Sequence, residues 1–502
     1  MAPPETAFMR ASDAFSWYME RDPVLRSTIV AVAWLDTGPD WDALQRRMGR
    51  AVELIPSFRA RPLVPPMRLS TPRWTLDPDF DLSWHLRRVA APPPGSPDTV
   101  IDMARKAATT GFDPVHPLWE FTLVEGLAGD RAALVMKVHH SLTDGIGGMQ
   151  LAMALFDLSP EASLADPTFD PGSTPEYPDG DGSDRRALAA SALIHSGRLV
   201  VDAARRQATG LLPALGQSAR HPTTVAGDAL GTLGSTMRMV APVRSTMSPV
   251  MVRRGLGRHL DMIRVGLDDL HHAAVVAGGT LNDAFVAALT GGLRRYHALH
   301  ASSVEELRLT LPISIRKSDD PIAGDRVTLM RFAVPVSIAD PADRIRATGE
   351  RCREARAERA IPYTNVIAGF LNLLPPSTVG SMLKCVDFLA SNVPGMPFPV
   401  YLAGARASGY FAFSPTIGAA LNATLISYDG ECCVGVNIDT DAVDDPAVMI
   451  DCLRQGFDEV LGLSDGTTAG SDPRPRKAAS PPASRARSKP TNAGGRPIGT
   501  AT

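Results

Sequence analysis

Apolar residues recur along the first 160 positions at spacings that predict both strands and helices. The pattern predicts strands at residues 27–35, 121–124 and 132–140, and helices at residues 41–54 and 98–109. Gly129 and Asp130 separate the last two strands, and a turn-forming pair between apolar runs is typical of a β-hairpin. Helical spacing resumes after Gly145. Residues 1–160 therefore form one predicted α+β unit.

A second α+β unit is predicted between residues 261 and 465. Its elements are helices at residues 267–277 and 280–296 and strands at residues 307–313, 331–338, 421–428 and 431–438. Asp429 and Gly430 form a two-residue turn between the last two strands, which is the best hairpin pattern in the chain. Residues 392–395, Asn-Val-Pro-Gly, consist largely of turn formers and predict a loop.

The segment that joins the two units, residues 161–260, differs in composition. Residues 159–185 are rich in Pro, Asp, Gly and Ser and predict an exposed, mobile connection. Beyond it, a predicted amphipathic helix has apolar residues on one side and basic residues on another: Leu193, Val200, Ala204 and Leu211 against Arg198 and Arg205. This helix either crosses between the two domains or contacts a membrane or lipid-droplet surface. Residues 466–502 predict a disordered basic tail, which either touches anionic lipid or only aids solubility.

Composition is that of an ordinary globular protein. The 502 residues are 44% hydrophobic and 21% charged, with a formal net charge of −3, which gives no general attraction to nucleic acid. The N-terminal stretch lacks the uninterrupted apolar core of a signal peptide, and no run of about 18 apolar residues predicts a membrane span. The five cysteines fit neither a disulfide framework nor a zinc spacing, so we expect a reducing cytoplasm. Cys432 and Cys433 could be nucleophiles, but their strand-like surroundings favour packing.

The main candidate for chemistry lies where the strand at residues 132–140 ends. From Lys137 to Gly145 the sequence is Lys-Val-His-His-Ser-Leu-Thr-Asp-Gly. Because strand side chains alternate between faces, His139 should face a more polar region with Lys137, while His140 faces an apolar one. A neutral imidazole can accept a proton from a substrate hydroxyl, which is general-base chemistry. A purely structural pair is the alternative, and neighbours on opposite faces are poorly placed to bind one metal ion.

These residues belong to a wider likeness. Residues 139–145 resemble the HHxxxDG motif of CoA-dependent acyltransferases, the chloramphenicol acetyltransferase-like superfamily that includes peptide-synthetase condensation domains. The family with the most similar further blocks is that of the bacterial wax ester synthase/diacylglycerol acyltransferases. Those blocks are Phe112-Asp113, Pro117-Leu118-Trp119-Glu120, Leu281-Asn282-Asp283-Ala284 and Ser391-Asn392-Val393-Pro394-Gly395. The likeness runs from Ala11 to about Leu463, which is most of the chain.

The resemblance implies two chloramphenicol acetyltransferase-like α/β domains with the active site in a channel between them. It implies acyl transfer from long-chain acyl-CoA, a co-substrate rather than a bound cofactor, to diacylglycerol or a long-chain alcohol, in triacylglycerol and lipid biosynthesis. His140 would be the general base beside His139, and Gly145 would permit the turn. Asp144 would order the loop through an arginine, for which Arg316 is a candidate. No metal is implied, and the enzyme would work in the cytoplasm, peripherally at a membrane or lipid-droplet surface.

The remaining blocks allow more than one interpretation. Asn282 and Asp283 stand where a helix begins, so they either cap it or line the reaction centre, where Asn282 could donate to an oxyanion. Trp119 is expected in the core. Residues 314–316 resemble the family's Pro-x-Ser-x-Arg block, but Gly324-Asp325 stands where the family usually has Gly-Asn, which changes the charge.

Two other classes of function are compatible with the motif. A condensation-type enzyme would take its acyl group from a carrier protein, and the Pro-Leu-Trp and Asn-Val-Pro-Gly blocks argue against it. A non-catalytic protein that binds lipid or coats droplets would keep its lipid association after loss of His140.

Overall fold

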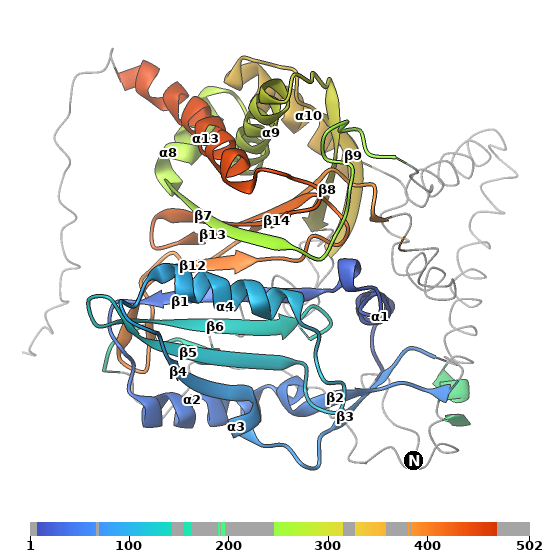
Figure 1. The fold of residues 1–502 in the computed structure, drawn as a ribbon, viewed down its shortest axis with the longest axis vertical. Coiled ribbons are helices and arrows are strands. Elements are labelled where there is room, and N and C mark those ends of the chain that lie inside the picture. The colour runs from blue at the N-terminus through green and yellow to red at the C-terminus, as the bar shows by residue number, and fades with distance from the viewer. Residues whose placement is uncertain are drawn as a thin grey trace, which may run out of the picture.

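A computed structural model describes residues 8–66, 70–142, 154–161, 245–314, 327–357 and 383–468, together with residues 152, 189–190, 192–195 and 380. Within these residues the chain forms two mixed α/β halves that stack on each other (Figure 1). Each half is built on a six-stranded sheet, and the confirmed fold class is the two-domain α/β class that the sequence predicts.

The first sheet carries the histidine pair. Its strand order is β11-β12-β1-β6-β5-β4. The strands are β1 (Thr28–Leu35), β4 (Leu86–Ala90), β5 (Trp119–Leu127), β6 (Arg131–His139), β11 (Tyr401–Leu402) and β12 (Ala405–Phe413). Only β4 and β5 run parallel; the other neighbours are antiparallel. The helix α4 (Pro97–Thr109) packs on β1 and β6 and also reaches the second half, so this sheet is tied directly to the other domain.

The second sheet has the strand order β7-β14-β13-β10-β8-β9. Its strands are β7 (Arg258–Gly266), β8 (Glu306–Ser314), β9 (Val327–Pro335), β10 (Phe388–Val393), β13 (Leu421–Tyr428) and β14 (Glu431–Asp439). Four helices lie over one face of it in Figure 1: α8 (Leu267–Val276), α9 (Leu281–Leu299), α10 (Pro341–Arg356) and α13 (Pro446–Thr468). Apolar side chains of α9 and α13 pack together with those of the sheet in one large core.

Smaller elements complete the first half. They are α1 (Ala11–Met19), η2 (Pro23–Leu25), α2 (Trp41–Leu54), η3 (Pro56–Arg59), β2 (Ala60–Leu63), β3 (Arg73–Leu76) and α3 (Leu82–His85). The helices α2 and α4 begin where side-chain acceptors meet free backbone N–H groups. Asp40 accepts from the N–H of Ala43 at 2.6 Å, and Ser96 accepts from that of Asp98 at 3.2 Å. These caps explain why both helices start close to the predicted positions.

Residues 401–413 cross from the second half and complete the first sheet. β12 runs antiparallel to β1, with Phe413 opposite Val30. A Cβ on Gly435 of β14 would lie 2.1 Å from the carbonyl oxygen of Ala412, so the two sheets approach at backbone distance here. The division of the chain near residues 160 and 261 does not describe this exchange, because pairing between distant strands leaves no local pattern.

Most predicted elements are present, with a few corrections. Both predicted hairpins form, as β5–β6 and as β13–β14. Asn392 and Val393 were expected in a loop but are the last residues of β10, since they pair in register with β13. β9 starts at Val327, earlier than predicted, and α13 continues to Thr468, past the predicted start of the tail. The amphipathic segment beyond residue 195 and the tail beyond 468 lie outside the described residues.

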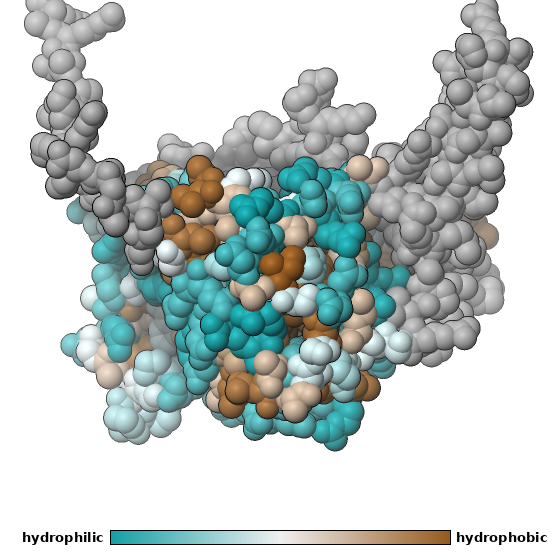
Figure 2. Space-filling view, turned by 90° about the horizontal axis from the view of Figure 1, so that it is seen from above, coloured by the Kyte–Doolittle hydropathy of each residue, from teal (hydrophilic) through white to brown (hydrophobic). Residues whose placement is uncertain are grey.

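The surface over the helices of the second half is mostly hydrophilic, with scattered apolar residues (Figure 2). No single helix in the described ranges is long and apolar enough to cross a membrane; α8 and α9 pass that test only as a pair, bent by 92°. Cys432 and Cys433 are fully buried free thiols, which confirms the packing interpretation.

Candidate active site

The histidine pair lies at the end of a central strand. β6 is flanked by β1 and β5, and His139 is its last residue, opposite Thr28 of β1. His139 is completely buried, whereas His140, the first residue after the strand, is half-buried. The strand therefore ends one residue earlier than predicted, and His140 lies in a turn to which strand alternation does not apply.

The ring of His139 is held by hydrogen bonds within the turn. Its Nδ1 accepts from the backbone N–H of Ser141 at 3.1 Å and lies 2.7 Å from the Ser141 hydroxyl. Because a backbone N–H can only donate, the neutral ring must carry its proton on Nε2. That Nε2 lies 3.4 Å from Oε2 of Glu20, next to the carboxylate but without a well-aligned hydrogen bond to it. Both ring nitrogens of His139 therefore face protein groups, and the residue is completely buried.

Aromatic rings enclose the same imidazole. Trp17 and Phe112 meet it edge-on, with ring centroids 5.6 and 5.9 Å away. Lys137, on the same face of β6, is also buried; its Nζ lies 4.2 Å from the Phe112 ring centroid and 3.0 Å from Oε1 of Glu120. Burial lowers the pKa of Lys137, and the Glu120 carboxylate opposes that shift in part. The face of β6 that carries Lys137 and His139 is therefore polar, as predicted, but it is buried.

The backbone N–H of His140 is hydrogen-bonded to Ser27, the residue that precedes β1. It donates to the carbonyl oxygen of Ser27 at 2.9 Å, and Ser27 is itself buried. As a whole residue, His140 is partly exposed, whereas His139 is completely buried.

Segments from both halves of the molecule meet beside this turn. Leu142 packs on a small apolar cluster around Leu25 and Leu118, and Leu383 and Ile417 from the C-terminal region pack on the same cluster. Close by, Nζ of Lys384 lies 2.5 Å from Oδ2 of Asp22. The motif is thus next to a contact between the two halves, in keeping with a site between domains.

Asn282 and Asp283 are at the start of α9, and Asp283 has the helix-capping role that is one of its two predicted roles. Thr280 accepts from the N–H of Asp283, and the Asp283 carboxylate accepts from the N–H of Thr280 at 2.9 Å, which is a capping box. The amide of Asn282 lies 4.0 Å from Sγ of Cys352 on α10. Whether either residue meets substrate stays a prediction.

Several predicted site residues cannot be placed. Asp144, Gly145, Arg316, Gly324 and Asp325 lie outside the described residues. Across the ranges that are described, no group of three or more His, Cys, Asp or Glu side chains could hold a metal ion.

Sequence reasoning missed the residues that surround the histidines. Glu20, Trp17, Ser27 and Phe112 come from distant segments, and none of them has a pattern that marks it as a neighbour of residue 139. In the sequence, Phe112 stands out only as part of a family block. Trp119, by contrast, is fully buried as predicted, and its indole N–H donates to the carbonyl oxygen of Phe58 at 2.9 Å.

The fold is shared with a wax ester synthase/diacylglycerol acyltransferase and with condensation domains of known structure. The wax ester synthase/diacylglycerol acyltransferase from Marinobacter aquaeolei VT8 superposes with a TM-score of 0.60 and 20% identity, over 91% of this chain and all of that one. The first condensation domain of the calcium-dependent antibiotic synthetase gives a TM-score of 0.59 at 14% identity, over 91% and 96% of the two chains. The class is therefore the two-domain, chloramphenicol acetyltransferase-like fold.

Sequence comparison identifies the family. The wax ester synthase/diacylglycerol acyltransferase catalytic domain matches residues 9–285, and the WS/DGAT C-terminal domain matches residues 323–460. A putative diacylglycerol O-acyltransferase of Mycobacterium tuberculosis H37Rv is 34% identical over 450 residues, 89% of this chain and 90% of that protein. The chain belongs to the wax ester synthase/diacylglycerol acyltransferase family, which confirms the resemblance and the acyltransferase class.

Proposed function

We propose that this protein transfers a long-chain acyl group from acyl-CoA to the free hydroxyl of diacylglycerol, with His140 as general base. The observation that carries the proposal is the difference between the two adjacent imidazoles. His139 is buried with its nitrogens directed at Ser141 and Glu20, while His140 stands half-buried in the turn beside the contact between the halves.

The chemistry requires one base and one leaving thiolate. A ring nitrogen of His140 accepts the hydroxyl proton as the alcohol oxygen attacks the thioester carbonyl of acyl-CoA. The tetrahedral oxyanion then collapses, the carbon–sulfur bond breaks, and the imidazolium returns the proton to the CoA thiolate. A positioned base contributes about 10²–10⁴-fold to such a step, and one oxyanion donor about 10²–10³-fold.

Other residues of the motif complete the proposal. Gly145 permits the turn after the strand, and Asp144 orders the loop through an arginine, with Arg316 as the candidate. Asn282, and the backbone at Asp283, contribute a donor to the oxyanion. The enzyme needs no cofactor or metal beyond its co-substrate acyl-CoA, and it meets its lipid at a membrane or lipid-droplet surface from the cytoplasmic side.

The test is an assay of purified protein with palmitoyl-CoA and a set of acceptors: diacylglycerol, hexadecanol and water. CoA thiol release gives the rate, and thin-layer chromatography identifies the product. Triacylglycerol as the main product supports the proposal. A wax ester as the main product would instead identify a long-chain alcohol as the acceptor, which the same base serves equally well.

Variants separate catalysis from lipid binding. His140→Ala should lower the rate about 10²–10⁴-fold while protein still pellets with phosphatidylcholine vesicles that contain diacylglycerol. His271→Ala is the matched control, because His271 is an exposed histidine on α8 in the other half. A protein without any acyl transfer, or one that keeps full activity as His140→Ala, would contradict the proposal.

A further inference from the structure

We propose that Glu20 is the positioning residue for His140. One of its carboxylate oxygens braces the peptide groups on both sides of the base. This inference rests on the proposed function of His140. The first connection runs through Ser27: Oε2 of Glu20 accepts from the N–H of Ser27 at 3.1 Å, and the carbonyl oxygen of Ser27 accepts from the N–H of His140 at 2.9 Å.

The second connection runs through the ring of His139. The same Oε2 lies 3.4 Å from Nε2 of His139, which carries the proton, and Nδ1 of that ring accepts from the N–H of Ser141 at 3.1 Å. The N–H groups of His140 and Ser141 flank the Cα from which the base projects. Both are therefore connected to a single oxygen at the end of α1: the first by hydrogen bonds through Ser27, the second by the ring of His139, whose Nε2 lies 3.4 Å from that oxygen.

The surroundings make this brace stiff. Glu20 is only 14% exposed, and Nε of Arg26 lies 3.6 Å from its other oxygen, which balances the charge. Ser27 and His139 are fully buried, and Trp17 and Phe112 confine the imidazole. A buried N–H on His139 also needs an acceptor, and the Glu20 carboxylate is the acceptor that it faces.

Positional accuracy explains why such a brace matters for turnover. A general base works only within hydrogen-bond reach of the proton that it accepts, and a displacement of about 1 Å can cost on the order of 10²-fold in rate. Glu20 contacts neither end of that proton transfer itself. It acts through Ser27 and His139, by fixing the backbone position of His140 and so the Cα that carries the imidazole.

Two substitutions at Glu20 test separately whether the length of its side chain or its negative charge positions His140. Glu20→Gln keeps the side-chain length, so its carbonyl oxygen can take the place of Oε2 beside both donors. Glu20→Asp keeps the charge but withdraws the carboxylate by about one carbon–carbon bond, ~1.5 Å. We expect kcat of Glu20→Gln within about threefold of the wild type and kcat of Glu20→Asp about 10–100-fold lower, with the KM for palmitoyl-CoA changed less than about twofold in both.

Hydrogen exchange tests the brace without turnover. Amides in the peptide that covers residues 139–142 should exchange faster in Glu20→Asp than in Glu20→Gln. Glu125→Asp is the matched control: it shortens by the same amount a carboxylate on β5 whose partner, Arg88, is 51% exposed, so kcat and this exchange should stay near wild type.

The outcomes are distinct. If kcat of Glu20→Asp equals or exceeds that of Glu20→Gln, the negative charge of Glu20 rather than the length of its side chain positions His140, and the inference is overturned. Unchanged exchange in Glu20→Asp would overturn it as well. A wild-type protein without acyl transfer, but with the expected order of exchange rates, would instead contradict the proposed function and leave the brace standing.

Discussion

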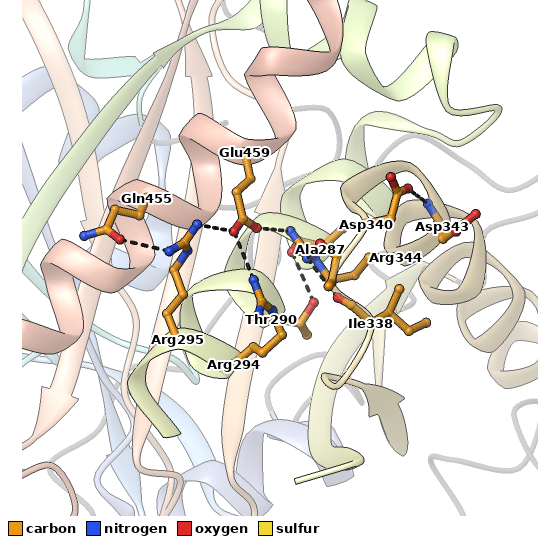
Figure 3. A network of polar contacts seen from close by, with 11 residues as sticks. Ala287, Thr290, Arg294, Arg295, Ile338, Asp340, Asp343, Arg344, Gln455 and Glu459 are labelled. Atoms are coloured by element: carbon orange, nitrogen blue, oxygen red, sulfur yellow. Dashed lines mark hydrogen bonds and ion pairs between the residues drawn. The ribbon is translucent and has the colours of Figure 1, made fainter. Parts of the chain in front are cut away.

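Nη2 of Arg344 lies 2.6 Å from Oε2 of Glu459, and this ion pair joins α10 to α13 inside the second half (Figure 3). Arg344 is completely buried, and its remaining donors reach the carbonyl oxygens of Ala287, Ile338 and Ala339 at 2.9–3.1 Å. Burial lowers the pKa of Arg344, but from a value so high that the guanidinium stays charged. Burial alone would raise the pKa of Glu459, and the hydrogen bond and charge of Arg344 hold it below its ordinary value.

Removal of the Glu459 carboxylate should lower the stability of the protein strongly. Glu459→Ala leaves a buried guanidinium without its counter-charge, beside Arg294 and Arg295, which also pair with Glu459. We expect the free energy of unfolding to fall by about 3–5 kcal/mol, measured by urea denaturation. Glu306→Ala is the control, because its partner Arg351 is 44% exposed and such surface pairs contribute about 1 kcal/mol or less. Equal losses in both variants would show that burial of Arg344 is not what matters.

Two buried histidines should make stability depend on pH. Nδ1 of His85 donates to the carbonyl oxygen of Trp119 at 2.7 Å, and Nδ1 of His297 donates to that of Leu293 at 2.8 Å. Each ring is 1% exposed, and burial lowers the pKa of both imidazoles. The unfolded chain therefore binds protons at a pH where the native state still does not.

The direction of that dependence follows from the depressed values. The stabilising contribution is complete above the unfolded pKa, near 6.5, and is lost as pH falls below it, by up to about 1.4 kcal/mol per pH unit for each histidine. Urea denaturation between pH 8 and pH 5 measures this slope. In His85→Asn/His297→Asn, where amide nitrogens can replace the Nδ1 donors, the slope should be shallower. The same slope in that variant would exclude these histidines as its source.

Two glycines should respond in opposite ways to an added methyl group. A Cβ on Gly395 would lie 1.7 Å from the carbonyl oxygen of Ser427, so Gly395→Ala forces the backbone of this block away from β13 and should cost about 1–3 kcal/mol or more. A Cβ on Gly49, inside α2, meets nothing within 4 Å, so Gly49→Ala should raise stability by about 0.5–1 kcal/mol. Thermal unfolding compares the two, and a stabilised Gly395→Ala would contradict the close approach.

Elements with a local cause could be predicted from the sequence. The β13–β14 hairpin depends on the turn at Asp429-Gly430, and the start of α9 depends on the capping box of Thr280 and Asp283, both of which involve residues a few positions apart. The motif at His139 and His140 could likewise be recognised, because it is one continuous stretch.

What only the tertiary structure decided is the environment of that motif. The pairing of β12 with β1, and the placement of Glu20 and Ser27 against His139 and His140, join segments that are far apart along the chain. No periodicity or turn residue encodes such contacts, since they arise when apolar faces of separate elements are buried together. The sequence therefore determined which histidines to consider, and packing decided that His139 is fully buried while His140 stays partly exposed.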